Sequence, residues 1–263
     1  MGYFRLWIEY MKIAIKEWNE YRIDFIFISI ASIITICLSV VNIEIIFTQV
    51  DNILGWTKYE VIWIFGFFTL VQCIFNTFFI NCFDIGSWVW SGKLDVLRIR
   101  PRNIIFQLLF TERYNVEFPV DQLIMGIALL IWSGVKLQIS FTLQKCFYFI
   151  GALMLSTFIY TCIVFIISAI SLWTVKNNYF VEFIFELESV NQYPLNIYGT
   201  GINFLLTYII PIGFVSFYPS QYILGHTEYY KYMFFSPVVA LILGVLSILI
   251  WKFGIKNYQS TNS

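Results

Sequence analysis

The run from Val61 to Cys82 contains no charged side chain, and it constrains the fold more than any other stretch of the chain. A helix that crosses a membrane needs about 20 consecutive, mostly apolar residues. Similar runs occur at Phe25 to Ile43, within Cys146 to Val175, and at Phe234 to Trp251. Only 12% of the chain is charged, whereas about a quarter of a soluble domain is charged. The sequence therefore predicts an all-α membrane protein, with residues 1–263 forming a single transmembrane domain.

Two further membrane-spanning helices, the third and the fifth, are less regular, and they bring the predicted number to six. The apolar run after Asp121 ends at Trp132, so the third helix is expected to begin near Glu117. The fifth is expected from about Tyr198 to Phe217, in a stretch interrupted by prolines. The sequence YPSQYILG follows and is too short to span. It is a candidate re-entrant segment between helices five and six, which requires burial in protein or a water-filled cavity.

Residues 1–22 have the pattern of an amphipathic helix. Charged side chains recur every three or four positions on one face, at Arg5, Glu9, Lys12, Lys16 and Glu20. A secretory signal would instead contain an uninterrupted apolar core of about 7–15 residues. We therefore expect an interfacial helix that lies in the membrane surface and precedes the first span.

The distribution of cations predicts the orientation. Six spans put both termini on the same side of the membrane, and Lys and Arg accumulate in cytoplasmic segments. With cytoplasmic termini, the inner segments hold 12 of the 16 cations. The outer segments hold the remaining cations, Lys58, Lys136, Lys145 and Lys231. Both termini are therefore predicted to be cytoplasmic, together with a large loop over residues 83–115 and a second segment over residues 174–198.

The sequence WSGKLDVLRIRPRNIIFQLLF, residues 90–110, combines charge with apolar residues in the large loop. Lys93, Arg98, Arg100 and Arg102 fall within ten positions and alternate with apolar side chains. Basic residues alone would hold the loop inside, but they would not need apolar neighbours or turn residues. The pattern indicates a short amphipathic element that docks on a partner.

This loop resembles the cytoplasmic loop of ABC-2 type permeases, the six-span membrane subunits of bacterial ABC exporters. The family pattern G-x-hydrophobic-D-x-x-L-x-x-P-x-N matches Gly92 to Asn103, with Gln107 after it. Two other stretches are similar to family motifs, Tyr193 to Tyr198 and Pro211 to Pro219. The likeness covers the whole chain in order, from the surface helix through the spans. Arg98 and Arg102 depart from it, since the family usually has apolar residues there.

The resemblance implies a permease that does not hydrolyse ATP itself. Two copies of a separate cytoplasmic ATPase, which would bind ATP and magnesium, would drive it, and a second permease of the same or a related chain would complete it. The cargo would be amphipathic or hydrophobic: a peptide, a lipid-like molecule or an antibiotic, exported across the bacterial cytoplasmic membrane. The ATPase-coupling loop would include Asp84, Gly92, Lys93, Asp95, Arg98, Arg100, Pro101, Arg102 and Asn103.

The residues agree that this chain is not its own motor. A phosphate-binding loop needs the pattern G-x-x-x-x-G-K-[ST]. The one Gly-Lys pair, Gly92-Lys93, is followed by Leu94. No enzyme activity, metal site or cofactor is therefore predicted for this chain. The net charge of zero gives no reason to expect a nucleic-acid partner.

Two sets of charged residues near the predicted inner boundary are further candidates. Arg113, Glu117 and Asp121 recur every four residues and share one helical face. They form either an inner gate or a set of solvated groups at the level of the lipid headgroups. Glu182 and Glu186 share a face of a probable helix from Asn178 to Glu188. They are either a second ATPase contact or part of an ordinary surface helix.

Isolated polar residues carry weaker signals. Gln72, Asn76 and Asn81 are expected to form hydrogen bonds between helices. His226 has no second histidine or cysteine nearby, so we expect a solvated residue in an outer loop beside Glu228. Two alternatives to the transporter remain open: an intramembrane lipid-modifying enzyme, and a channel or scaffold subunit without ATP coupling.

Overall fold

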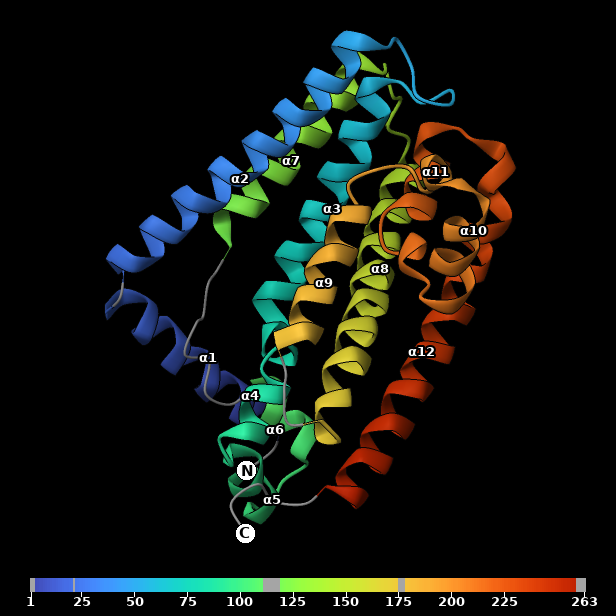
Figure 1. Ribbon diagram of the computed structural model, residues 1–263. Helices are drawn as coiled ribbons and strands as arrows, with labels where there is room; N and C mark the ends of the chain where they lie inside the picture. The colour runs from blue at the N-terminus through green and yellow to red at the C-terminus, as the bar shows by residue number, and fades with distance from the viewer. Residues whose placement is uncertain (1–2, 21, 111–118, 175–177, 259–263) are drawn as a thin grey trace.

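The computed structural model describes residues 3–20, 22–110, 119–174 and 178–258, and these residues fold into a bundle of helices (Figure 1). The longer helices are α1 (Tyr3–Glu20), α2 (Arg22–Gln49), α3 (Lys58–Phe78), α7 (Val120–Lys136), α8 (Leu143–Ala169), α9 (Asn178–Val190) and α12 (Tyr230–Asn257). The shorter α-helices are α4 (Ile85–Trp90), α5 (Lys93–Ile99), α6 (Ile104–Phe110), α10 (Gly199–Phe204) and α11 (Phe217–Leu224).

Six short turns of other helix types complete the regular structure. They are η1 (Ile80–Cys82), η2 (Ile170–Leu172), η3 (Leu195–Tyr198), η4 (Leu205–Ile209), η5 (Ile212–Phe214) and η6 (Thr227–Tyr229). Within the described ranges there is no strand, only one isolated bridge between Ile53 and Trp56. The prediction of an all-α protein is therefore confirmed for this part of the chain.

Four segments are long and apolar enough to cross a membrane: α2, α3, α8 with η2, and η6 with α12. They correspond to the predicted first, second, fourth and sixth spans. All four start before the predicted first residue, and α2 and α12 also run six residues past the predicted last one. The third predicted span is represented by α7, which has 17 described residues. The total of six spans stays a prediction.

Helix α3 lies at the centre of the bundle, and glycines bring α7 close to it. A Cβ placed on Gly66 would lie 3.0 Å from the Leu129 Cβ, and one on Gly126 would lie 2.7 Å from the Leu70 Cδ2. Small residues at a helix crossing let the two backbones approach closely, which is the usual source of contact energy inside a membrane. An amide pair adds to this contact, because Asn76 Nδ2 donates to Gln122 Oε1 at 3.1 Å. The expected hydrogen bonding between helices is confirmed here.

The expected fifth helix, from about Tyr198 to Phe217, is wrong as a continuous element. This stretch breaks into η3, α10, the π-turn η4, η5 and the start of α11. Pro211 causes one break, since proline has no N–H for the helix ladder. The preceding helix α9 packs along α8 (Figure 1). The assignment of residues 174–198 to a second cytoplasmic segment stays a prediction.

The broken backbone after α9 is satisfied by side chains of α8. Lys145 Nζ donates to the Ile223 carbonyl at 3.3 Å, and Tyr148 Oη donates to the Pro219 carbonyl at 2.9 Å. Ser156 Oγ donates to the Phe214 carbonyl at 3.3 Å. Irregular backbone at membrane depth needs such partners, because lipid offers none. The candidate re-entrant segment forms α11, whose residues from Phe217 to Gln221 are all buried. Its re-entry into the membrane stays a prediction.

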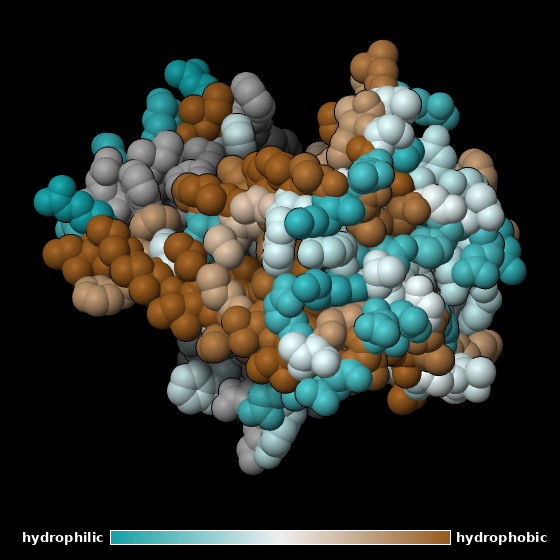
Figure 2. Space-filling model, turned by 90° about the horizontal axis from the view of Figure 1, so that it is seen from above, coloured by the Kyte–Doolittle hydropathy of each residue, from teal (hydrophilic) through white to brown (hydrophobic). Residues whose placement is uncertain are grey.

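The two ends of the bundle are built from different elements. We call the end with α4, α5, α6 and the last turn of α12 the basal end, and the opposite end the α11 end (Figure 1). Helix α2 leans away from the centre and is largely exposed, with contacts to α7 and α3. Seen from the α11 end, polar side chains gather on the half that holds α10 to α12, and apolar ones extend toward α2 (Figure 2).

Candidate functional site: a folded basic loop at the basal end

The predicted coupling loop folds into three short helices. Residues 85–90, 93–99 and 104–110 form α4, α5 and α6, which turn back on one another at the basal end (Figure 1). Gly92 joins α4 to α5 with φ of +71°, a left-handed conformation that glycine adopts at little cost. Asp84 stands immediately before α4, and its carbonyl accepts from the Trp88 N–H at 3.0 Å. Residues 83–110, the described part of the loop, therefore form a folded element and not an extended linker.

Buried amides hold the loop in this shape. Gln107 is 1% exposed. Its Nε2 donates to the Leu97 carbonyl at 3.3 Å and to the Arg102 carbonyl at 3.1 Å. Asn81, which follows α3, donates from Nδ2 to the Leu108 carbonyl at 3.1 Å and to the Leu109 carbonyl at 3.3 Å. One amide therefore joins α5 to α6, and the other joins α6 to the end of α3.

The outer face of the loop presents cations with apolar residues between them. Leu94 and Leu97 are buried, whereas Val96 is exposed and Ile99 is 84% exposed. The predicted residues Lys93, Arg98, Arg100, Pro101, Arg102 and Asn103 are exposed. Asn103 also caps α6, because its Oδ1 accepts from the Phe106 N–H at 3.2 Å. Structure and sequence thus agree on an amphipathic surface with a basic outer face.

Arg98 links this surface to Tyr258, the residue that follows α12. Arg98 NH1 lies 3.8 Å from Asp95 Oδ1, and the Arg98 guanidinium lies over the Tyr258 ring, 5.6 Å from its centroid. Tyr258 is buried. Burial and the neighbouring Asp95 carboxylate raise the pKa of Tyr258, while Arg98 acts in the opposite direction. The sequence motif contains Asp95 and Arg98 but gives no sign of Tyr258, because Tyr258 lies far away in the chain.

The other predicted site residues do not join this cluster. Asp121 is buried in the first turn of α7, where a carboxylate is favoured by the helix dipole. Its expected partners in the inner gate, Arg113 and Glu117, lie outside the described residues. Glu182 and Glu186 are exposed on α9. Their role as a second ATPase contact stays a prediction.

Glu188 on α9 was not predicted as a site residue, and it has a buried partner. The Tyr160 hydroxyl of α8 donates a hydrogen bond to Glu188 Oε1. Tyr160 is 1% exposed and stacks edge to face with Phe75, with ring centroids 4.8 Å apart. Ionisable groups inside a membrane bundle need partners of this kind. The contact fixes α9 against α8, and neither residue stands in a motif that could have revealed it.

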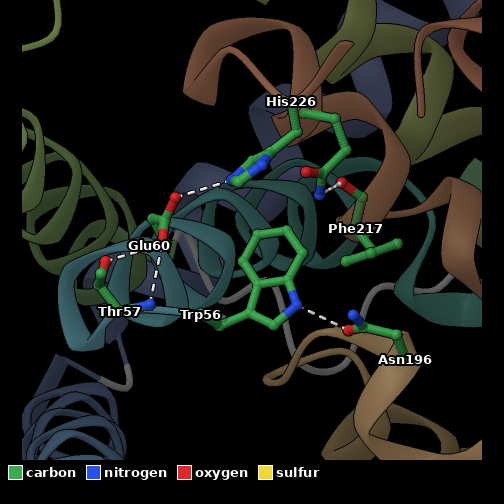
Figure 3. Close-up of polar contacts among 7 residues, drawn as sticks. Trp56, Thr57, Glu60, Asn196, Phe217 and His226 are labelled. Carbon is green, nitrogen blue, oxygen red and sulfur yellow. Dashed lines mark hydrogen bonds and ion pairs between the residues drawn. The ribbon is translucent and has the colours of Figure 1, made fainter. Parts of the chain in front are cut away.

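The α11 end carries a second polar cluster (Figure 3). His226 Nε2 lies 2.7 Å from Glu60 Oε1, and the Trp56 ring packs against the His226 ring at a tilt, with centroids 4.6 Å apart. Trp56 Nε1 donates to Asn196 Oδ1 at 2.7 Å. The prediction of a solvated His226 beside Glu228 is wrong, because the fold brings a buried carboxylate from α3 to it. Across the described ranges, no group of three His, Cys, Asp or Glu side chains is placed to hold a metal ion.

These features define an integral membrane protein with a helical bundle and a folded basic loop at one end. The family model of the ABC-2 family transporter protein matches residues 33–262 of the 263-residue chain. The chain therefore belongs to the ABC-2 transporter family, as its motifs indicated, and is a membrane permease component of an ABC transporter. Comparisons with curated proteins and with solved structures found no match.

Proposed function

We propose that this chain is the permease subunit of an ATP-driven exporter, and that its basal loop is the element on which a separate ATPase acts. The observation that carries the proposal is the ordered amphipathic loop at the basal end, with Ile99 84% exposed among cations. A patch of exposed apolar side chains with a polar rim is typical of a protein-binding surface, and Val96 is exposed one helical turn from Ile99. Under this proposal, the basal end and both termini face the cytoplasm, and the membrane is the bacterial cytoplasmic membrane.

The proposed partner is a cytoplasmic ABC ATPase in two copies, one for each permease of a pair. ATP and magnesium would bind in the ATPase and not in this chain. The second permease would be another copy or a related chain. The proposed cargo is amphipathic or hydrophobic, as a peptide, a lipid-like molecule or an antibiotic would be. Asp121, with Arg113 and Glu117, is the proposed inner gate.

The contacts of the loop suggest how a movement would spread. Closure of the ATPases would displace α5. Gln107 would carry α6 along, because its amide bonds to carbonyls on both sides of the turn. Asn81 would pass the displacement to the end of α3 through the α6 carbonyls. Since α3 packs closely on α7 at Gly66 and Gly126, both helices would move together, shutting the inner mouth as the outer one opens.

Copurification tests the partnership. The tagged protein is extracted from its native membrane in mild detergent, and the proteins that remain bound are identified. We expect a stoichiometric subunit with a phosphate-binding loop. The substitutions Asp95→Lys and Ile99→Asp should remove this subunit, because they reverse a charge and place a carboxylate in the apolar contact. They should leave membrane insertion unchanged.

Lys136→Gln is the matched control, since Lys136 is exposed at the end of α7 that faces away from the loop. It should retain the ATPase in full. If the wild-type protein came out alone even after crosslinking, the transporter proposal would be wrong and the channel or enzyme alternatives would gain support. If all variants retained the ATPase equally, the partnership would stand but the loop would not be its binding surface.

A further inference from the structure

An apolar groove runs between α8, α12 and α6 on the side of the bundle. Its volume is about 450 Å³, within the range of small-molecule sites. Its walls include Phe158 and Phe165 of α8, Val245 and Ile248 of α12, and Ile105 and Leu109 of α6. Phe158, Val245 and Ile248 are also exposed, so the groove opens outward to the surroundings of the bundle. Its chemistry fits a hydrocarbon chain.

The α12 wall of the groove ends in a cation. Leu241, Val245 and Ile248 line the groove, and Lys252 follows Ile248 by four positions. Residues three and four apart share a helix face, so Lys252 continues this lining stripe toward the basal end. Lys256 lies one turn further along. Both lysines are exposed, and long lysine side chains near a helix end reach the headgroup level.

The α6 wall of the groove also has a cation at its basal end. Ile105 and Leu109 line the groove. Arg102 precedes Ile105 by three residues and lies in the turn before α6, at the basal end. Arg98 lies close to the end of α12 through its contact with the Tyr258 ring. The apolar groove is therefore continuous with a basic patch at its basal end, contributed by two separate segments of the chain.

We propose that this groove binds an anionic glycerophospholipid, with an acyl chain between α8 and α12 and the phosphate beside Lys252 and Lys256. Charge complementarity at the basal end of the apolar groove favours this occupant. A zwitterionic lipid would fill the same hydrocarbon space but would gain less from the lysines. Because α6 belongs to the basal loop, the bound lipid would contact the loop and α12 at once. This inference does not depend on the direction of transport or on the cargo.

Native mass spectrometry tests the site with the purified full chain and two probes, phosphatidylglycerol and phosphatidylcholine. We expect preferential retention of phosphatidylglycerol. Lys252→Gln should weaken it about fivefold, the factor for ~1 kcal/mol per cation near an anionic lipid surface. Lys231→Gln is the control, because Lys231 is an exposed lysine of the same helix at the α11 end. It should have no effect.

A second pair of variants tests the groove itself. Val245→Trp fills it, whereas Leu249→Trp puts the same side chain on an exposed position of α12 that does not line it. Val245→Trp alone should reduce retention several-fold, with both variants eluting as the wild type does in gel filtration. Equal retention by both variants, equal loss in both lysine variants, or equal binding of the two lipids would each overturn the proposal. So would a bound species of non-phospholipid mass that Val245→Trp displaces.

Discussion

His226 Nε2 lies 2.7 Å from Glu60 Oε1, which joins two residues 166 positions apart. Glu60 has a second role in the same place, because its Oε2 accepts from the Thr57 N–H and the Thr57 hydroxyl, both at 2.8 Å. The carboxylate thus caps α3 and holds the turn before α12 at the same time. Trp56 extends the link to η3 through Asn196. The start of α3, from Trp56 to Glu60, is therefore joined both to His226 and to Asn196 at the α11 end.

Removing the histidine should loosen this end of the bundle. His226→Leu leaves a largely buried carboxylate oxygen without its partner, which costs about 1–3 kcal/mol. We expect earlier thermal unfolding in detergent, measured by circular dichroism. His226→Gln, which can still donate to Glu60, should recover most of the loss. A melting curve for His226→Leu that overlaps the wild-type curve would show that the contact contributes no stability.

A larger side chain at Gly126 should separate α7 from α3. Its Cβ position lies 2.7 Å from the Leu70 Cδ2 and 3.3 Å from the Gly66 carbonyl oxygen. Gly126→Val should cost about 1–3 kcal/mol, as overpacking usually does, and should lower the yield of monodisperse protein. Gly151→Ala is the control, because nothing lies within 4 Å of a Cβ there. Similar behaviour of the two variants in thermal unfolding would contradict the close packing.

Gln107→Leu should open the basal loop. The substitution leaves the Leu97 and Arg102 carbonyls without the donor they now share, at a cost of about 1–3 kcal/mol if they stay buried. Trypsin should then cleave faster after Arg98 and Arg102. Gln49→Leu, at the far end of α2 and exposed, should leave the cleavage rate unchanged. Unchanged cleavage in Gln107→Leu would mean that this amide does not order the loop.

Tyr258 should matter for coupling through its ring and not through its hydroxyl. The Arg98 guanidinium lies over the ring, a contact of about 0.5–2 kcal/mol that Tyr258→Phe retains and Tyr258→Ala removes. Under the proposed function, cargo-stimulated ATP hydrolysis should fall in the alanine variant and persist in the phenylalanine variant. The amount of ATPase that copurifies with each variant shows separately whether the loop is still folded. Equal activity of both variants would exclude a role for this link.

Much of the fold follows from local pattern. The charge-free run at Val61 predicted α3, and the runs at Phe25, Cys146 and Phe234 predicted α2, α8 and α12, because a membrane span is recognised by length and apolar content alone. The helix ends were less accurate. Helices continue past the apolar run wherever capping groups or water satisfy their last amides and carbonyls, as the capping box of Thr57 and Glu60 does for α3.

The fifth predicted span failed for a definite reason. The stretch around Tyr198 to Phe217 is apolar enough for a span, but Pro211 and glycines break it into short turns. Donors from α8 stabilise this segment and the helix that follows it. Ser156 bonds to the Phe214 carbonyl, and Lys145 and Tyr148 bond to the Ile223 and Pro219 carbonyls of α11. A hydropathy profile considers only neighbours in the sequence, so it cannot predict hydrogen-bond donors that come from another helix.

The class of the molecule, its family and the basic loop from Gly92 to Asn103 can all be predicted from the amino-acid sequence. Each of these depends on composition or on residues close together in the chain. The contacts between distant residues could be seen only in the folded chain: Glu60 with His226, Tyr160 with Glu188, and Arg98 with Tyr258. Helix packing brings each pair together, and Tyr160 and Glu188, which lie within the bundle, also pair because lipid cannot solvate them. The sequence separation of such partners follows no period, so no local pattern predicts them.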